Sequence, residues 1–236
     1  MRSAGLPPLR SPLPLDADKA RAVRSMFDTI APRYERVNRI ISLGLDARWR
    51  RKCLASAAFP PDACVIDLAT GTGDFCRLLQ AGGRRPIGVD FSLGMLRNAT
   101  TDAPLIQADA LRLPMADGTV DGVVCGFALR NFVDLPLFFA EMARVARAGA
   151  RIGLLDAARP TSRLARAGHR VYFGRVVPLI GAALSDASAY RYLPSSLTYL
   201  PERTELIEMI RSAGFTNVEW RSLTWGAAQL ITGTRS

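Results

Sequence analysis

The sequence predicts an α/β fold built on a doubly wound, mostly parallel sheet. Short apolar runs of strand length alternate with helical patterns along residues 63–156, which is typical of a parallel sheet covered on both faces. Two further runs, 218–225 and 227–232, are joined by a tight turn and predict an antiparallel hairpin at one edge. We therefore expect seven strands. A chain of 236 residues with 49% hydrophobic residues suits a single domain.

The segment before the first strand is expected to be a tail followed by helices. Residues 1–17 carry four prolines and no apolar core of a signal peptide, so we expect a disordered tail there. Residues 18–60 contain three stretches with apolar residues at helical spacing, 23–30, 34–41 and 49–57. These stretches predict helices that precede the sheet, and Gly44 and Pro60 mark helix ends.

The five central strands follow in order. They are expected at 63–68, 86–90, 105–109, 120–128 and 151–156. Helical patterns separate them, and Asp134 predicts an N-cap for an apolar stripe that runs to Val145.

The alternation stops at residues 159–200. This segment is rich in tyrosine and proline, and it predicts an irregular, partly helical insertion over the sheet. Its apolar run Val176–Leu184 either lines the path of a greasy ligand or forms the core of the insertion. A helix over 202–213, ended by Gly214, then leads into the hairpin.

Charge and cysteine usage limit the partners. The net charge is +10, nearly all of it from arginine. Either an anionic partner, such as nucleic acid or a membrane surface, or an arginine-rich composition explains it. The four cysteines form no C-x-x-C pair and there is one histidine, so we expect free thiols and no metal site. No uncharged apolar run has the length of a membrane span.

The stretch VIDLATGTGDF, Val65–Phe75, carries a glycine turn that does not fit a phosphate ligand. The dinucleotide fingerprint needs a third glycine, and residue 76 is a cysteine. A Walker-type loop needs a lysine followed by serine or threonine, which is absent here. Asp74 places a carboxylate at the mouth of the turn, where it would repel a pyrophosphate and tolerate a cation.

Three acidic residues stand at the ends of predicted strands. They are Asp67, Asp90 and Asp109. In an open parallel sheet, ligands bind outside the carboxyl ends of the strands. Asp90 can accept hydrogen bonds from two ribose hydroxyls, and Asp109 can accept one from an adenine amino group. A nucleoside with a positive, phosphate-free tail fits this pattern, and S-adenosylmethionine is such a ligand; a plain tight turn is the alternative.

Six segments also resemble one known family. They are MFDTIAPRYERVNRIISLG (Met26–Gly44), DLATGTGD (Asp67–Asp74), VDFSLGML (Val89–Leu96), QADALRLPMADGTVD (Gln107–Asp121), GFALRNFVD (Gly126–Asp134) and YRYLPSSLTYLP (Tyr190–Pro201). They resemble the ubiquinone/menaquinone biosynthesis C-methyltransferases, class I enzymes that methylate prenylated quinols. The resemblance covers about residues 20–234. It implies a Rossmann-like fold, S-adenosylmethionine as cofactor and demethylmenaquinol as substrate.

The resemblance also implies site residues. The cofactor-binding set is Tyr34, Asp67, Gly71, Thr72, Gly73, Asp90, Phe91, Asp109, Ala110 and Gly126, and the catalytic pair is Arg130 and Asn131. Tyr34 closes over the cofactor or is a core residue. Residues 18–236 form one methyltransferase domain in this interpretation, with 159–200 as a lid.

The chemistry gives Arg130 a role. A ring carbon attacks a methyl group only once an adjacent hydroxyl loses its proton, and that phenol has an unperturbed pKa of roughly 10. A fixed cation would stabilise the phenolate, so we expect Arg130 to orient it and Asn131 to position the loop or the substrate. The alternative is a structural ion pair between Arg130 and a carboxylate such as Asp156. His169 lies in an arginine-rich stretch and is expected at the surface.

Departures from the family pattern keep other functions open. Gly126 stands where serine is common, Ala128 where glycine is common, and Trp225 replaces a small residue in the hairpin turn. A methyltransferase of a small phenol is therefore one alternative. A nucleic-acid-binding protein is another, although no recognition motif supports it and we expect no nucleic-acid partner.

The expected partners follow from the substrate. The lipophilic quinol resides in the bilayer, so we expect a cytoplasmic protein with peripheral contact at the inner membrane face. Self-association as a homo-oligomer is expected only by analogy with the family.

Overall fold

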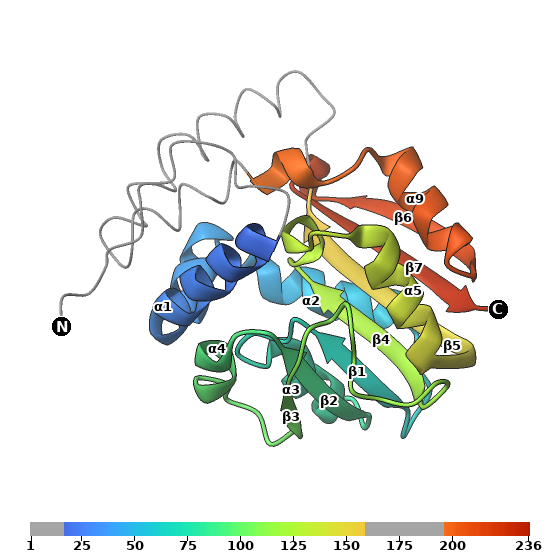
Figure 1. The fold of residues 1–236 in the computed structure, drawn as a ribbon, viewed down its shortest axis with the longest axis horizontal. Helices are drawn as coiled ribbons and strands as arrows, with labels where there is room; N and C mark the ends of the chain where they lie inside the picture. The colour runs from blue at the N-terminus through green and yellow to red at the C-terminus, as the bar shows by residue number, and fades with distance from the viewer. Residues whose placement is uncertain (1–16, 159–195) are drawn as a thin grey trace.

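A computed structural model describes residues 17–158 and 196–236 as one seven-stranded sheet between helical layers (Figure 1). The strand order is β3-β2-β1-β4-β5-β7-β6. β1 to β5 pair in parallel, β7 runs antiparallel to β5, and β6 runs antiparallel to β7. The predicted fold class, including the C-terminal hairpin, is confirmed.

The element bounds follow the predicted order. The strands are β1 Cys64–Leu68, β2 Arg85–Asp90, β3 Leu105–Gln107, β4 Val120–Gly126, β5 Ala146–Ala157, β6 Phe215–Leu223 and β7 Ala228–Arg235. The α-helices are α1 Ala17–Ile41, α2 Leu45–Ala57, α3 Asp74–Ala81, α4 Leu93–Arg97, α5 Leu135–Val145 and α9 Arg203–Ser212. The short 3-10 helices are η1 Leu129–Asn131, η3 Leu197–Tyr199 and η4 Thr224–Gly226.

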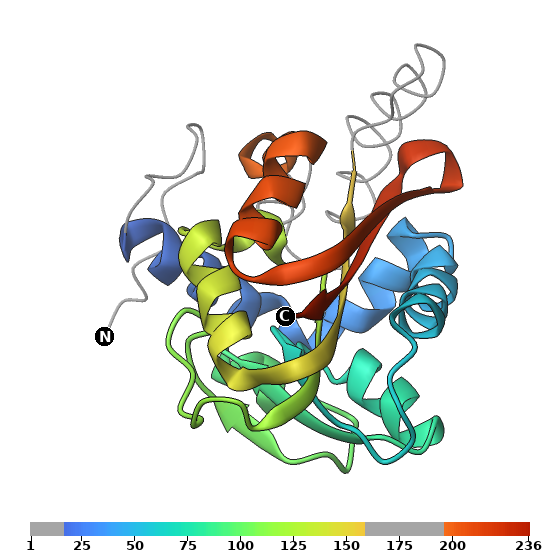
Figure 2. The ribbon, with the colours of Figure 1, turned by 90° about the vertical axis from the view of Figure 1, so that its right-hand side faces the viewer.

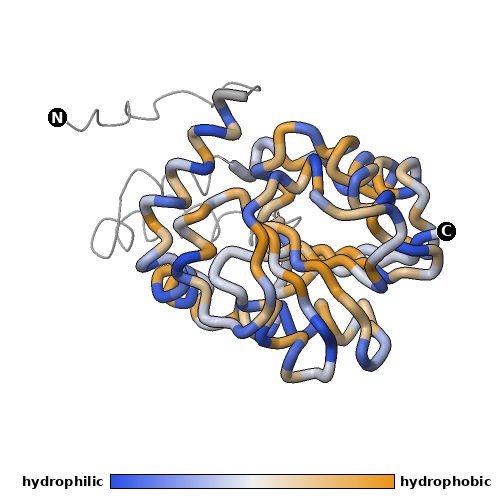
Figure 3. Tube along the Cα trace, turned by 60° about the horizontal axis from the view of Figure 1, so that its bottom comes forward, coloured by the Kyte–Doolittle hydropathy of each residue, from blue (hydrophilic) through white to orange (hydrophobic). Residues whose placement is uncertain are grey.

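The two faces of the sheet bury different helices (Figure 2). Ile66 of β1 packs in a cluster with α5 and α9, whereas its neighbour Val65 packs in a cluster with α2 and α3. Successive strand residues point to opposite faces, so a fully apolar strand serves both layers. Figure 3 shows the hydrophobic residues concentrated along these central strands. Burial on both faces of the sheet explains why these strands are continuous apolar runs in the sequence.

The first two predicted helices form one continuous helix, α1, which passes through Pro32. A proline inside a helix costs about 3 kcal/mol. Met26, Ile30, Val37 and Ile41 continue one buried stripe across the proline, and burying such side chains stabilises by about 1.5–3 kcal/mol each. The stripe therefore outweighs the proline, which lies on the exposed side.

Another difference concerns β5, which begins at Ala146 and not at Arg151. Ala146 already pairs with Val120, and the register shifts before Gly122 pairs with Arg151. The intervening Ala148-Gly149-Ala150 turn, with Gly149 at φ +81°, is absorbed into the strand as an irregularity.

An ionic network ties α1, α2 and α3 together. Arg50 of α2 pairs with Asp46 at 2.8 Å and with Asp74 of α3 at 3.1 Å. Arg77 of α3 also pairs with Asp74, and it contacts Glu35 of α1 at 3.0 Å. The Asp74 carboxylate is thus held between two arginines at the start of α3.

Helix α1 is also fixed to the loop after β2. Asp28 Oδ1 accepts hydrogen bonds from Ser92 Oγ at 2.6 Å and from the Gly94 amide at 2.8 Å. Ser92 is the N-cap of α4 and accepts from the Met95 amide. Because Asp28 caps this loop from above, α1 lies close beside α4, as Figure 1 shows.

Several expectations lie outside the described residues. These are the tail at residues 1–16, the insertion over 159–195 with its run Val176–Leu184, and His169. Within the two described ranges, no helix combines the length and the apolar character that crossing a bilayer requires.

Gly94→Ala tests the docking of α1. A Cβ at this position would lie 2.8 Å from Asp28 Cα and 3.0 Å from the Asp28 carbonyl oxygen. Backbone atoms cannot rotate away, so we expect α1 to lift from α4 at a cost of about 1–3 kcal/mol. Hydrogen exchange over residues 22–34 should accelerate, while exchange in β4 stays unchanged. Asp28→Ala removes the same contact without a clash and should show the same pattern; unchanged exchange in both variants would refute this docking.

Candidate active site

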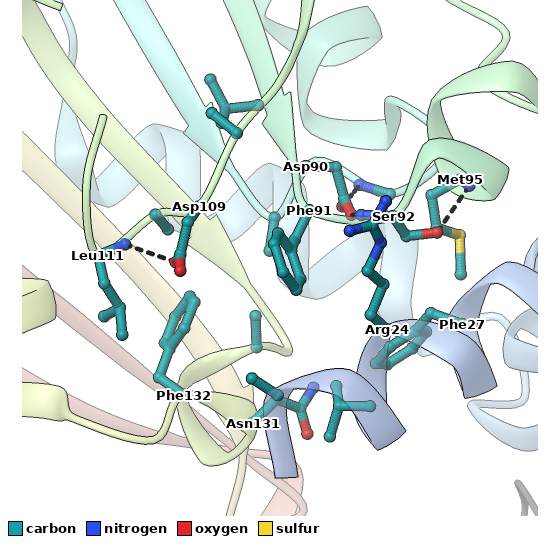
Figure 4. Close-up of a pocket in the computed structure, with 18 of the residues that line it drawn as sticks. Arg24, Phe27, Asp90, Phe91, Ser92, Met95, Asp109, Leu111, Asn131 and Phe132 are labelled. Carbon is teal, nitrogen blue, oxygen red and sulfur yellow. Dashed lines mark hydrogen bonds between the residues drawn. The ribbon is translucent and has the colours of Figure 1, made fainter. Parts of the chain in front are cut away.

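A cavity opens between α1 and the carboxyl ends of the central strands (Figure 4). Its walls come from the glycine turn after β1, the end of β2, residues 108–111 after β3, the segment that follows β4, and α1. This is the edge at which open parallel sheets bind their ligands. Eight predicted site residues line the cavity, namely Tyr34, Gly71, Asp90, Phe91, Asp109, Ala110, Gly126 and Asn131.

Asp90, the last residue of β2, is the central polar group of the cavity. Its side chain is buried, and its two oxygens accept hydrogen bonds from the Gly71 amide and the Ser92 amide, each at 2.8 Å. Burial raises the pKa of this carboxyl to about 6, against the opposing effect of the two amide bonds. One carboxylate therefore fixes the glycine turn and the next loop at the same time.

The glycine turn needs its glycines for conformation and for space. Gly71 and Gly73 have φ angles of +58° and +87°, the left-handed region that glycine adopts without strain. A Cβ on Gly73 would also lie 2.7 Å from Thr101 Cγ2. Tyr34 of α1 is the nearest group above Gly71, with its Cε1 atom 3.9 Å from the position of a Cβ. Burial raises the pKa of Tyr34, so its hydroxyl stays protonated at neutral pH.

The wall formed by α1 contains residues that the sequence analysis did not single out. The Arg24 guanidinium lies 4.8 Å from the centre of the Phe91 ring, and Figure 4 shows both side chains in the wall of the cavity. The rings of Phe27 and Tyr34 pack in a T-shaped arrangement. Arg24 and Phe27 both belong to the helix that carries Asp28. The prediction that Tyr34 closes over the cofactor placed this helix near the glycine turn, but no pattern in the sequence indicated that Arg24 and Phe27 lie beside the end of β2.

A second acidic residue, Asp109, lines the cavity on the side opposite Asp90. Asp109 lies after β3 and accepts a hydrogen bond from the Leu111 amide at 2.9 Å (Figure 4). It is exposed to solvent, unlike Asp90. The two carboxylates predicted to bind the ribose and the adenine thus line one cavity.

Asp67, by contrast, lies beneath the turn and does not line the cavity. It is almost fully buried, and its Oδ2 accepts hydrogen bonds from Thr70 Oγ1 at 2.5 Å and from Cys76 Sγ at 3.6 Å. Burial raises the pKa of Asp67 to about 7. Thr72 and Gly73 also lie outside the lining. Asp67 therefore holds the turn through Thr70, and Thr72 and Gly73 form part of the turn itself.

Arg130 is held in a buried ion pair with Asp156. Its Nη1 contacts Asp156 Oδ1, and its Nε donates to Ser196 Oγ at 3.0 Å. The Asp156 side chain is fully buried, and Arg130 does not line the cavity. This geometry favours the structural alternative for Arg130. Its neighbour Asn131, in the same turn η1, does line the cavity.

Lys19 connects α1 with the segment after β4. Its Nζ donates to the Phe132 carbonyl at 3.3 Å and lies 4.3 Å from the centre of the Tyr199 ring. Burial lowers the pKa of this lysine. Sequence reasoning missed Lys19 because it stands at the edge of the tail, where no periodic pattern marks it.

Comparison with known proteins assigns the chain to a family. The profile of the ubiE/COQ5 methyltransferase family matches residues 15–235. The chain belongs to the ubiE/COQ5 methyltransferase family. A demethylmenaquinone methyltransferase from Roseiflexus sp. (strain RS-1) is 43% identical over 94% of this chain and 97% of the relative. Another from Deinococcus radiodurans is 42% identical over 96% of this chain and 98% of the relative.

A solved structure supports the fold independently. A SAM-dependent methyltransferase from Aquifex aeolicus superimposes with a TM-score of 0.60 over 86% of this chain and 98% of that chain. The sequence identity is 14%, so this likeness shows the Rossmann-like methyltransferase fold alone. The family resemblance predicted from the sequence motifs is confirmed.

Gly126, a departure from the ubiE/COQ5 family pattern, has a local cause. A Cβ at Gly126 would lie 2.6 Å from Cε2 of Phe75, whose ring packs against the end of β4. A serine here would require that ring to move. In this methyltransferase Gly126 therefore leaves the space that the Phe75 ring occupies.

The described part of this methyltransferase offers no metal centre. No group of three or more histidine, cysteine, aspartate or glutamate side chains there could hold an ion. The four cysteines are free thiols.

A double-mutant cycle separates the structural from the catalytic reading of Arg130. Removing one partner of a buried pair leaves an uncompensated charge, at a cost of about 3–5 kcal/mol. Arg130→Met and Asp156→Leu should each destabilise by that amount, and the double variant should regain most of the loss in urea unfolding.

The control for this cycle is Arg221→Met. Arg221 pairs with Glu219 at 2.9 Å with both side chains more than half exposed, so its loss should cost under about 1 kcal/mol. Full stability of Arg130→Met together with lost turnover would contradict the structural reading.

Proposed function

We propose that this chain transfers the methyl group of S-adenosylmethionine to a ring carbon of demethylmenaquinol. Family membership and relatives named demethylmenaquinone methyltransferase support the reaction. The observation that carries the cofactor assignment is the buried Asp90 carboxylate, which stands at the carboxyl end of β2 beside a glycine turn.

The residues of the cavity fit the cofactor. Asp90 would accept hydrogen bonds from the ribose hydroxyls, and the Gly71 turn lets the backbone approach the ligand closely. Phe91 and Ala110 offer apolar surface for the adenine, and Asp109 lies where it can accept from the amino group. When bound, the cofactor supplies an electrophilic methyl group on a sulfonium.

The remaining cavity wall suits an aromatic acceptor. Val23, Phe27, Phe132 and Val133 present apolar surface, and Asn131 adds a polar side chain among them. We assign Asn131 the contact with the quinol oxygen, where its amide can donate to the phenolate as the charge develops. Arg130 acts as a positioning residue, since its ion pair with Asp156 fixes the turn η1 that carries Asn131.

The partners and the location are part of the same proposal. A prenylated quinol is dissolved in the bilayer, so the enzyme acts in the cytoplasm with peripheral contact at the inner membrane face. The positive net charge supports attraction to anionic lipid. The proposal involves no nucleic acid and leaves self-association as a homo-oligomer to be measured.

Transfer of radiolabelled methyl from S-adenosylmethionine tests the function. We expect turnover with short-chain demethylmenaquinol and at least about tenfold lower kcat/KM with demethoxyubiquinol and with simple naphthols, because each lost apolar or polar contact costs about 1–3 kcal/mol. Preference for an unprenylated naphthol would favour the small-phenol methyltransferase instead.

Asn131→Ala provides the site-specific arm of this assay. It should lower kcat by about 10²–10³ while leaving affinity for S-adenosylhomocysteine unchanged, as for loss of one oxyanion donor. Unchanged kcat in this variant would remove Asn131 from the mechanism.

A further inference from the structure

Two large apolar side chains are strongly exposed on the described surface. Trp225 is 88% exposed and Leu43 is 74% exposed, and Ile40 nearby is 44% exposed. Single exposed apolar residues are ordinary, but a group of them indicates an interaction surface.

These three residues lie at one corner of the molecule. Trp49 of α2 donates its Nε1 proton to Thr224 Oγ1 at 2.9 Å, which joins α2 to η4, the turn that carries Trp225. Leu43 stands two residues before Leu45, the first residue of α2. Ile40 is in the last turn of α1, one turn before Leu43. We call Ile40, Leu43 and Trp225 the apolar corner.

The backbone at and beside the apolar corner is strained at three residues. Leu43 has φ +54°, Thr224 has φ +48° and Trp225 has φ +53°. Bulky side chains adopt this left-handed region rarely and under strain. The exposed Trp225 ring gains little from packing inside the chain in return. Contact with something outside the chain would account for a tryptophan in this conformation.

A basic face adjoins the corner. Arg48, Arg51 and Lys52 are exposed on the side of α2 opposite its buried residues Cys53 and Ala57. None of the three forms an ion pair with another residue that the structure describes. An exposed tryptophan and leucine beside exposed cations match the composition of interfacial membrane-binding surfaces.

The corner lies at the same edge of the sheet as the active site. η4 leads into Ala228, which pairs with Ala157 at the carboxyl end of β5. Gly126 of the cavity ends the neighbouring strand β4, opposite Leu155 of β5. A membrane surface in contact with the apolar corner would therefore also lie beside the edge of the sheet at which the cavity opens.

We propose that the apolar corner and the basic face of α2 together form the membrane-docking surface of this enzyme. Trp225 and Leu43 enter the interfacial layer, and Arg48, Arg51 and Lys52 meet anionic lipid headgroups. The inference rests on the proposed function, since a bilayer-dissolved quinol requires such contact. A second copy of the chain fits less well, because a twofold contact here would bring like-charged faces together.

Vesicle flotation tests the surface with the full-length chain. The vesicles are phosphatidylcholine alone, or with about one third phosphatidylglycerol to supply anionic charge. The apolar variants are Trp225→Asn and Leu43→Asn, since asparagine tolerates the left-handed backbone. The charge variant is Arg48→Gln/Arg51→Gln/Lys52→Gln, and its matched control is Arg85→Gln/Arg151→Gln/Arg211→Gln, three exposed arginines elsewhere.

We expect the wild type to float with anionic vesicles and the charge variant to bind about a hundredfold more weakly, because each surface charge contributes about a factor of five. Each apolar variant should bind at least about tenfold more weakly. The control variant should lose much less affinity for anionic vesicles than the charge variant. Brominated lipid should quench Trp225, a signal that Trp225→Asn removes although Trp49 and Trp220 remain.

Three results would overturn the proposal. The first is that the wild type binds neither kind of vesicle. The second is that the control variant loses as much vesicle affinity as the charge variant. The third is that light scattering shows a dimer that depends on the apolar corner, while vesicles are not bound.

The charge variant and its control should unfold at the wild-type temperature, and the asparagine variants at that temperature or above it, because asparagine relieves the left-handed backbone. All variants should methylate a water-soluble short-chain quinol at the wild-type rate. If vesicles bind as expected but no quinol is methylated, the proposed function fails and the docking surface stands.

Discussion

The site depends on the carboxylate of Asp90. Its two oxygens hold the Gly71 amide of the glycine turn and the Ser92 amide of the following loop. Ser92 in turn donates its hydroxyl proton to Asp28 of α1. Three segments far apart in the sequence are thereby connected through one short hydrogen-bond chain. Without an acceptor at position 90, the turn, the loop and the covering helix would each lose an anchor.

The same carboxylate links folding to ligand binding. Burial penalises the charged form of Asp90 and raises its pKa to about 6, because the buried carboxylate loses part of the hydration that it would have in water. A ligand that donates two hydroxyl protons would relieve that penalty. The arrangement therefore suits a nucleoside whose ribose hydroxyls donate to this carboxylate.

Sequence patterns predicted the sheet well because strand order follows from alternation and burial. Details that depend on tertiary contacts were less accessible. The continuity of α1 through Pro32 depends on an apolar stripe that packs against Met95 of α4. Asp74 pairs with Arg77 of its own helix, three residues further on, and with Arg50 of α2, whose packing against α3 no local pattern shows. The direct catalytic role for Arg130 remains a prediction, although its pairing with Asp156 matches the alternative derived from the residues.

Calorimetric titration with S-adenosylhomocysteine at several pH values tests the central role of Asp90. Ligand hydroxyls bind the carboxylate form, and the folded-state pKa is raised to about 6, so affinity should be constant above about pH 7 and fall by up to tenfold per unit below about pH 6. Asp90→Asn should bind about 10- to 100-fold more weakly at pH 8, without this pH dependence. Wild-type affinity in Asp90→Asn at pH 8 would contradict the account.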